Sequence, residues 1–107
     1  MNKYNIDKFI SGGYIFDKLD RYAQIIALTR TNKKHAYTSW AFPKYLKQLC
    51  KDDYALKYNW CFKIGKRIFV KTSMRNNDGL IVATCIFCFV ETDKNYCEKK
   101  NDAETKS

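Results

Sequence analysis

One amphipathic helix, followed by a series of strand-like segments, most constrains how this chain can fold. The helix is predicted over residues 12–31, where apolar side chains recur at helical spacing: Ile15, Phe16, Leu19, Tyr22, Ala23, Ile26 and Ala27. At about 100° per residue, these side chains cover an arc of roughly 140° on one side of the helix. An apolar stripe of this width has to be buried against another element.

Asp20 lies at the edge of this stripe, roughly 20° beyond its boundary. Asp17 and Lys18 point well away from the stripe, as solvated charges should. A carboxylate at the margin of an apolar face is partly removed from water, which makes it a better base than a solvated carboxylate. The alternative is a structural role, either as a boundary residue or as the partner of a nearby cation.

The residues after the helix predict an antiparallel sheet. Strands are predicted over residues 35–42, 54–62, 67–74 and 80–91, with a short strand at 45–49 and an N-terminal strand or arm within residues 1–9. The segment 80–91 is the most apolar and is expected in the centre of the sheet, whereas Pro43 restricts its own segment to a strand end or an edge. A single helix packed across a curved antiparallel sheet is an α+β architecture.

Length and composition limit the chain to one domain. Of its 107 residues, 46% are hydrophobic, which is enough to form a core; we expect the domain to span residues 1–93, followed by a charged, disordered tail at 94–107. No apolar run approaches the ~18 residues of a membrane span, and the N-terminus lacks the apolar stretch of a signal peptide. A cytoplasmic location is therefore expected.

Five cysteines are spread along the chain, an odd number that favours reduced thiols over a disulfide framework. Cys85 and Cys88 have the spacing of a metal or redox pair. However, they fall within a predicted strand, where side chains three residues apart point to opposite faces. We expect no metal site and no cofactor, and interpret the cysteines as small hydrophobic residues.

The net charge of +9 suits an anionic ligand. The lysines are dispersed rather than clustered, so the charge alone does not identify that ligand and nucleic acid is disfavoured as a partner. A basic nucleic-acid-binding module stays open as an alternative because alternation places Tyr54, Leu56, Tyr58 and Trp60 on one face of a predicted strand. That face is equally the expected core or interface face.

Several motifs together resemble those of a known family. Asn5 precedes Gly12 by seven residues, Gly12-Gly13 opens the helix, and Asp20 follows Gly13 by seven. Further matches are Ala23, Ala27, Thr38, the pair Tyr45-Leu46, the turn at Gly65 and the segment 84–93. This register resembles that of the short bacterial acyl-CoA thioesterases, and the resemblance implies their hotdog fold, a long central helix wrapped by a curved antiparallel sheet.

The resemblance implies hydrolysis of the acyl-CoA thioester. Asp20 is then expected to act as general base or nucleophile, with the amides of Gly13 and Tyr14, beside Gly12, as donors to the oxyanion. A helix that begins with two glycines exposes free N–H groups and its positive dipole end. Asn5 is expected to orient water or the carbonyl, with a turn or cap role as its alternative, and Thr38 is expected to contact the substrate.

Gly13 and Asp20 are about 11 Å apart along the helix. The family pattern therefore places the site between two chains, and a homodimer or a trimer of dimers is expected. The basic residues expected to contact the phosphates of coenzyme A (CoA) are Lys63, Lys66, Arg67 and Lys71. A solvated hairpin is the alternative interpretation of these four residues.

Two other hotdog hypotheses stay open. A hotdog dehydratase needs a histidine before the helix, whereas His35 follows the helix, so this hypothesis is the weaker one. The chain also departs from the thioesterase pattern at Lys8, Ser11, Gln48 and Asp52. These departures make a hotdog protein that folds and pairs but hydrolyses poorly a further alternative.

Overall fold

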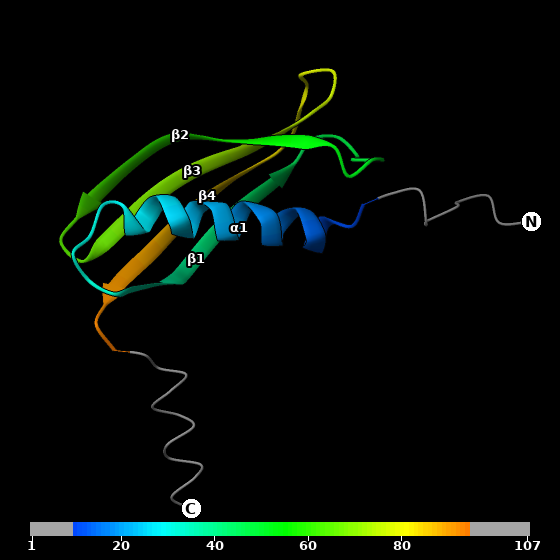
Figure 1. Cartoon of the computed structure of the whole chain (residues 1–107). Coiled ribbons are helices and arrows are strands. Elements are labelled where there is room, and N and C mark those ends of the chain that lie inside the picture. The colour runs from blue at the N-terminus through cyan, green and yellow to red at the C-terminus, as the bar shows by residue number, and fades with distance from the viewer. Residues whose placement is uncertain (1–9, 95–107) are drawn as a thin grey trace, which may run out of the picture.

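The computed structural model describes residues 10–94, which form one helix and four strands (Figure 1). Helix α1 spans Gly12–Leu28, and the strands are β1 (His35–Tyr45), β2 (Tyr54–Ile64), β3 (Arg67–Asn76) and β4 (Ile81–Thr92). This confirms the predicted α+β order of one helix followed by an antiparallel sheet. Asn5, the predicted N-terminal strand or arm, and the tail beyond Lys94 lie outside the described residues.

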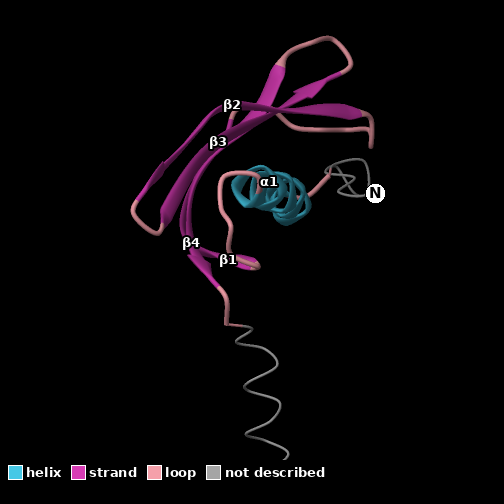
Figure 2. Cartoon of the chain, turned by 60° about the vertical axis from the view of Figure 1, so that its left-hand side comes forward, coloured by secondary structure: helices cyan, strands magenta, loops and turns pink. Residues whose placement is uncertain are grey.

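The four strands form one sheet in the order β1-β4-β3-β2, with all neighbours antiparallel. β4 is central, as its apolar sequence predicts. β1 lies at an edge, where a proline such as Pro43 is tolerated because one side of the strand needs no ladder hydrogen bonds. The sheet curves around α1, which lies along its concave face (Figure 2).

One predicted helix boundary and one predicted strand are wrong. The helix ends at Leu28 rather than near Thr31, because Thr29 caps it and donates its amide to the carbonyls of Ile26 and Ala27. The short strand predicted at 45–49 does not form: β1 continues through Pro43 to residue 45, and the chain then turns, with the amides of residues 46 and 47 both donating to the carbonyl of Val82.

The core lies between α1 and the concave face of the sheet. The buried residues of α1 are Ile15, Leu19, Ala23 and Ala27, all members of the predicted stripe. They pack with alternate residues of the two central strands, among them Ile68, Val70, Met74, Cys85, Phe87 and Phe89. Phe87 stacks on Phe89 with ring centroids 5.7 Å apart. Cys85 is thus a core residue, as expected of a small hydrophobic side chain.

A β-bulge in β2 decides which face Trp60 occupies. Tyr54 and Leu56 pack against the core, but the register of β2 on β3 shifts between Tyr58 and Trp60. Cys61 then packs against the core and Trp60 points to the outer, convex face. The prediction that Trp60 shares a face with Tyr54 is wrong, because one inserted residue reverses the alternation.

Candidate active site

Helix α1 begins with Ser11 as its N-cap, followed by Gly12 and Gly13. The backbone amide of Tyr14 donates to Ser11 Oγ at 3.1 Å, so this amide is already satisfied within the chain. A serine directly before a glycine-led helix is a local capping signal that the sequence itself carries. The amides of Gly12 and Gly13 have no acceptor among residues 10–94, and the first turn holds no acidic residue to neutralise the helix dipole.

The two glycines lie in different surroundings. A Cβ on Gly13 would meet only Ser11 Oγ, at 3.9 Å, so the approach to its amide is open. A Cβ on Gly12 would stand 3.5 Å from the Tyr45 ring, and Tyr45 Oη donates to the Gly12 carbonyl at 3.2 Å. Tyr45 therefore connects the end of β1 to the start of the helix through this hydrogen bond.

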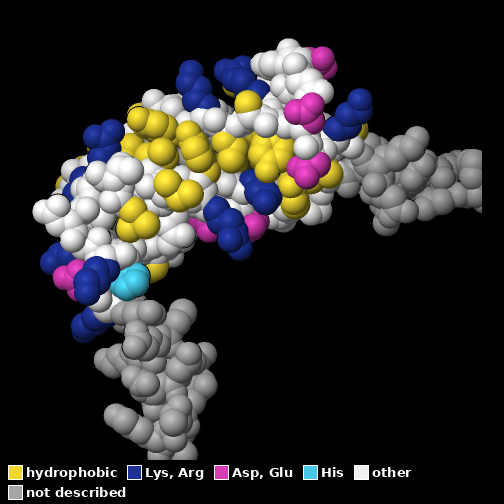
Figure 3. Space-filling model, in the orientation of Figure 1, with side chains coloured by type: hydrophobic (Ala, Val, Ile, Leu, Met, Phe, Trp, Pro, Cys, Tyr) yellow, Lys and Arg dark blue, Asp and Glu magenta, His cyan; other side chains and the backbone are white. Residues whose placement is uncertain are grey.

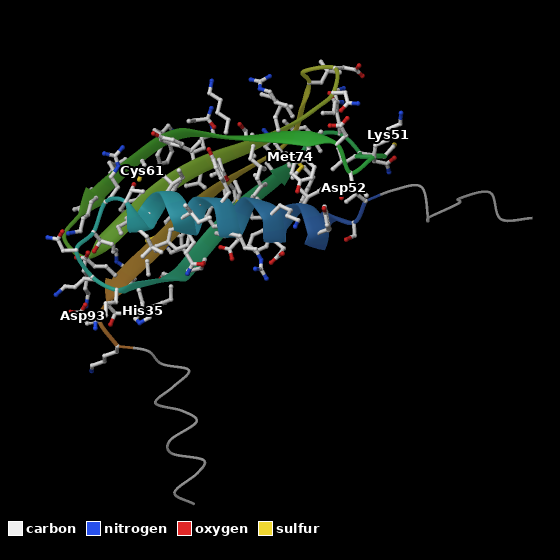
Figure 4. The ribbon with its side chains drawn as sticks, viewed as in Figure 1. His35, Lys51, Asp52, Cys61, Met74 and Asp93 are labelled. Carbon is white, nitrogen blue, oxygen red and sulfur yellow. The ribbon has the colours of Figure 1, made fainter. Side chains whose placement is uncertain are left out.

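The side chain of Tyr14 packs toward the segment between β1 and β2. Its hydroxyl donates to Asp52 Oδ1 at 2.6 Å, and Asp52 lies near the start of α1 (Figure 4). The bond to Asp52 raises the pKa of Tyr14 well above its usual range. Tyr14 therefore stays protonated and serves as a structural donor rather than as a base. This contact explains why Asp52 suits a position where the related pattern has glycine.

Asp20 and Thr38 meet where α1 passes the edge strand β1. Thr38 Oγ1 donates to Asp20 Oδ1 at 2.9 Å, which fixes the orientation of the carboxylate. Asp20 is half-buried and Thr38 is exposed. Among residues 10–94, no donor is bonded to Asp20 Oδ2, so this oxygen is free to accept a hydrogen bond. The sequence predicts a role for each residue, and the fold brings the two together.

Other reactive groups are inert or distant. Burial raises the pKa of the Cys85 thiol to about 12, so it is a poor nucleophile. His35 lies at the start of β1, near Asp93 and away from the helix start (Figure 4). Within the described part of the chain, no three His, Cys, Asp or Glu side chains are grouped to hold a metal ion. The same residues include no helix of the length and apolarity that crossing a membrane requires.

The four basic residues predicted to bind CoA phosphates do not share a surface. Lys63 faces the helix side of the sheet, where its Nζ lies 3.0 Å from Glu91 Oε1. Arg67 and Lys71 face the outer side, and Lys66 lies in the turn between β2 and β3. The turn between β2 and β3 lies at the C-terminal end of α1, far from the start of the helix (Figure 1). On the helix side, basic side chains are scattered around a band of hydrophobic ones (Figure 3).

A cavity of about 290 Å³ lies among the loops beyond the start of the helix. It is lined by Gln48, Leu49, Cys50, Lys51 and Asp53 and by the turn at 76–78. Neither Asp20 nor Thr38 lines this cavity, so the cavity is separate from the Asp20–Thr38 pair.

Comparison with solved structures identifies the fold. A Streptococcus mutans protein bound to acetyl-CoA aligns with a TM-score of 0.72 and 25% identity, over 85% of this chain and 73% of that one. A hypothetical thioesterase from Streptococcus pneumoniae with CoA aligns at 0.70 and 22%, over 86% and 71%. A hexameric thioesterase from Yersinia pestis aligns at 0.68 and 19%, over 84% and 78%. This chain has the hotdog fold.

The hotdog assignment confirms the fold that the motif register implies. No family model matches the sequence, and no curated protein matches it either. With identities of 25% or less to these structures, little of the likeness lies in the sequence. The hotdog domain is recognised from the arrangement of its helix and sheet.

Proposed function

We propose that this hotdog domain hydrolyses acyl-CoA thioesters, with Asp20 as the catalytic carboxylate. The observation that carries the proposal is the 2.9 Å bond from Thr38 to Asp20, which presents an oriented carboxylate beside an edge strand. It is supported by the similar solved structures, which include thioesterases and complexes with CoA or acetyl-CoA. Two more of them are single variants of the pneumococcal protein: in one an aspartate is replaced by alanine, and in the other a threonine is replaced by alanine.

The proposed reaction is a general-base hydrolysis. Asp20 Oδ2 takes a proton from water, and the water oxygen forms a bond to the thioester carbonyl carbon, whose oxygen becomes negative. The intermediate collapses as the C–S bond breaks, and the thiolate takes the proton from Asp20 to give a carboxylic acid and CoA. Direct attack by Asp20, through an anhydride that water then hydrolyses, uses the same placement.

The oxyanion donors come from a second copy of the chain in this proposal. Gly13 lies seven residues before Asp20 in one helix, about 11 Å away, which is too far for both to contact one carbonyl. β1 is 11 residues long and forms one edge of the sheet. An edge strand of this length is suited to pairing with another chain.

Pairing of two β1 strands would bring the right groups together. If the two β1 strands pair antiparallel about a two-fold axis at Phe42, Trp40 lies opposite Lys44 of the second copy. Ser39 is the bulged residue and takes no partner, so Thr38 lies opposite Tyr45 of the second copy. Tyr45 holds the start of its own helix. The free Gly12 and Gly13 amides of one copy would thus approach Asp20 of the other, giving two equal sites.

The activity is tested by measuring CoA thiol release across a series of acyl-chain lengths. We expect turnover with at least one acyl-CoA, lost in Asp20→Asn. Thiol release no faster than that of Asp20→Asn for every chain length would overturn the proposal and favour a hotdog protein with lost activity.

The pairing is tested by cross-linking through Phe42. Cα atoms of directly opposite residues are about 4.5–5.5 Å apart, within reach of a disulfide. Phe42→Cys in a Cys50→Ser background should therefore give a covalent dimer on mild oxidation, whereas Ile25→Cys, on the exposed side of α1, should not. Light scattering that shows a monomer at micromolar concentration would contradict the shared site.

A further inference from the structure

The outer face of the sheet, turned away from α1, carries adjacent aromatic rings from three strands. Ring centroids are 5.4 Å apart for Trp60 and Phe62, 5.1 Å for Phe62 and Phe69, and 6.2 Å for Phe69 and Trp40. Phe42 lies on the same face, two residues along β1 from Trp40. We call these five residues the aromatic platform.

The aromatic platform is well exposed. The exposed fractions are 70% for Phe42, 46% for Trp40 and Phe62, and 37% for Trp60. At about 200 Å² per large aromatic side chain, these fractions amount to roughly 400 Å² of ring surface. A contiguous apolar patch of this size on a small domain indicates a binding surface.

Every charged residue that shares this face is basic. The strand register places Lys71 beside Trp60, Arg67 beside Ile64 and Lys57 beside Ser73, and Lys44 faces outward from β1. Glu91 is the single acidic residue in the four strands, and it faces the helix side, where it binds Lys63. The platform is therefore flanked by cations, and no residue of the four strands places a carboxylate on this face.

Ser73 is a buried polar residue of the same face. Its register partners are Lys57 on β2 and Thr84 on β4, which put it on the outer face. The side chain is 1% exposed, and Ser73 Oγ has no hydrogen-bond partner among the described residues. Thr72 Oγ1, on the helix side of the same strand, is buried and unpartnered in the same way, so the Ser73 hydroxyl is enclosed by the sheet and is not a contact for a ligand on this face.

We propose that the outer face binds single-stranded nucleic acid, with bases stacked on the aromatic platform and phosphates held by the surrounding cations. Stacking on aromatic rings and charge pairing with phosphates are the two interactions that such ligands need. A second copy fits this face poorly, because symmetric packing would place its cations against one another without an anion. The surface lies on the opposite side of the sheet from Asp20 and goes beyond the proposed hydrolysis.

Binding is measured by fluorescence anisotropy with labelled oligothymidine and oligouridine of roughly 12 nucleotides. The full-length chain should bind both at low salt. If Lys44, Lys57, Arg67 and Lys71 contact four phosphates, affinity should fall roughly 50-fold between about 50 and 200 mM salt. Excess CoA should not displace the oligonucleotide, and thiol release by Trp60→Ala should match that of the native chain, which separates this test from that of the hydrolysis.

Matched variants distinguish the platform from general attraction. Trp60→Ala should weaken binding about 5- to 150-fold, and Trp60→Phe should retain most of it. Tyr58→Ala is the control, because Tyr58 lies on the same strand with a similar exposure of 39% but faces the helix side. Lys71→Gln should reduce the logarithmic salt slope by about 0.7, and Lys18→Gln on α1 should leave it unchanged.

Three results would overturn the proposal. The first is no change in anisotropy at low salt. The second is binding that Trp60→Ala leaves unchanged or weakens no more than Tyr58→Ala does, which would show that the aromatic platform does not stack the bases. The third is an oligomer that Trp60→Ala dissociates while oligonucleotides fail to bind, which would make this face a contact between copies.

Discussion

Replacing Asp20 by asparagine should separate catalysis from folding. The asparagine keeps the size of the side chain, and its carbonyl oxygen can still accept the bond that Thr38 Oγ1 donates at 2.9 Å. It cannot take a proton from water or attack a carbonyl. We therefore expect a variant that folds and associates like the native chain but turns over slowly.

The two expected magnitudes are far apart. A hydrogen bond to a charged acceptor contributes about 1 kcal/mol more to stability than one to a neutral acceptor. The free energy of unfolding should therefore fall by about that amount in Asp20→Asn. For a domain of this size the midpoint of thermal unfolding then falls by about 4–8 °C. Loss of a general base lowers kcat by about 10²–10⁴, equivalent to roughly 3–5 kcal/mol in the activation barrier.

Thiol release, circular dichroism and light scattering are measured on Asp20→Asn and on a matched control, Asp17→Asn. Asp17 lies on the solvated side of the same helix and pairs with Arg21 at 3.0 Å, an exposed contact that contributes about 0–1 kcal/mol. The control should keep native kcat. Near-native kcat in Asp20→Asn, an equal loss in both variants, or unfolding of Asp20→Asn alone would refute the catalytic assignment and leave Asp20 a structural residue.

Four further substitutions test other parts of the structure. Gly13→Ala should fold normally, since its Cβ meets only one atom within 4 Å, but should lower kcat by placing a methyl group beside the proposed oxyanion donor; unchanged kcat would count against that donor. The hydrogen bond from Thr31 lowers the pKa of Glu91, so the Glu91 carboxylate stabilises the fold at neutral pH and this stabilisation is lost as the pH falls below about 4.5. The free energy of unfolding, measured from pH 3 to 7, should therefore depend less on pH in Glu91→Gln than in the native chain. Phe87→Ala, fully buried, should cost about 3–5 kcal/mol in denaturant unfolding, and Ile25→Ala, 63% exposed, less than about 0.5 kcal/mol.

The proposed hydrolysis also carries a prediction of where coenzyme A does not bind. Arg67 and Lys71 face the outer side of the sheet, so neutralising them should leave KM for acyl-CoA unchanged. A several-fold rise in KM with unchanged kcat would return these residues to the CoA site, as the sequence first suggests.

Periodicity and turn chemistry were enough to predict the elements of this fold. The stripe of α1 and the apolar run of β4 are local patterns that report burial directly. Ile15, Leu19, Ala23 and Ala27 of the stripe are buried, and so is most of β4. Gly65 and Gly79 mark the two hairpin turns, each with a positive φ that favours glycine. The spacing of Gly12, Gly13 and Asp20 also pointed to the helix that carries the candidate site.

Tertiary structure decided which side chains meet. Thr38 and Asp20 are 18 residues apart in the chain, and only the passage of α1 beside the edge strand brings them to 2.9 Å. The bulge before Trp60 is invisible to an alternating pattern, yet it moves that ring from the expected core face to the aromatic platform. Local patterns report burial one element at a time, whereas register, bulges and packing fix contacts between elements, and on those contacts both proposed sites depend.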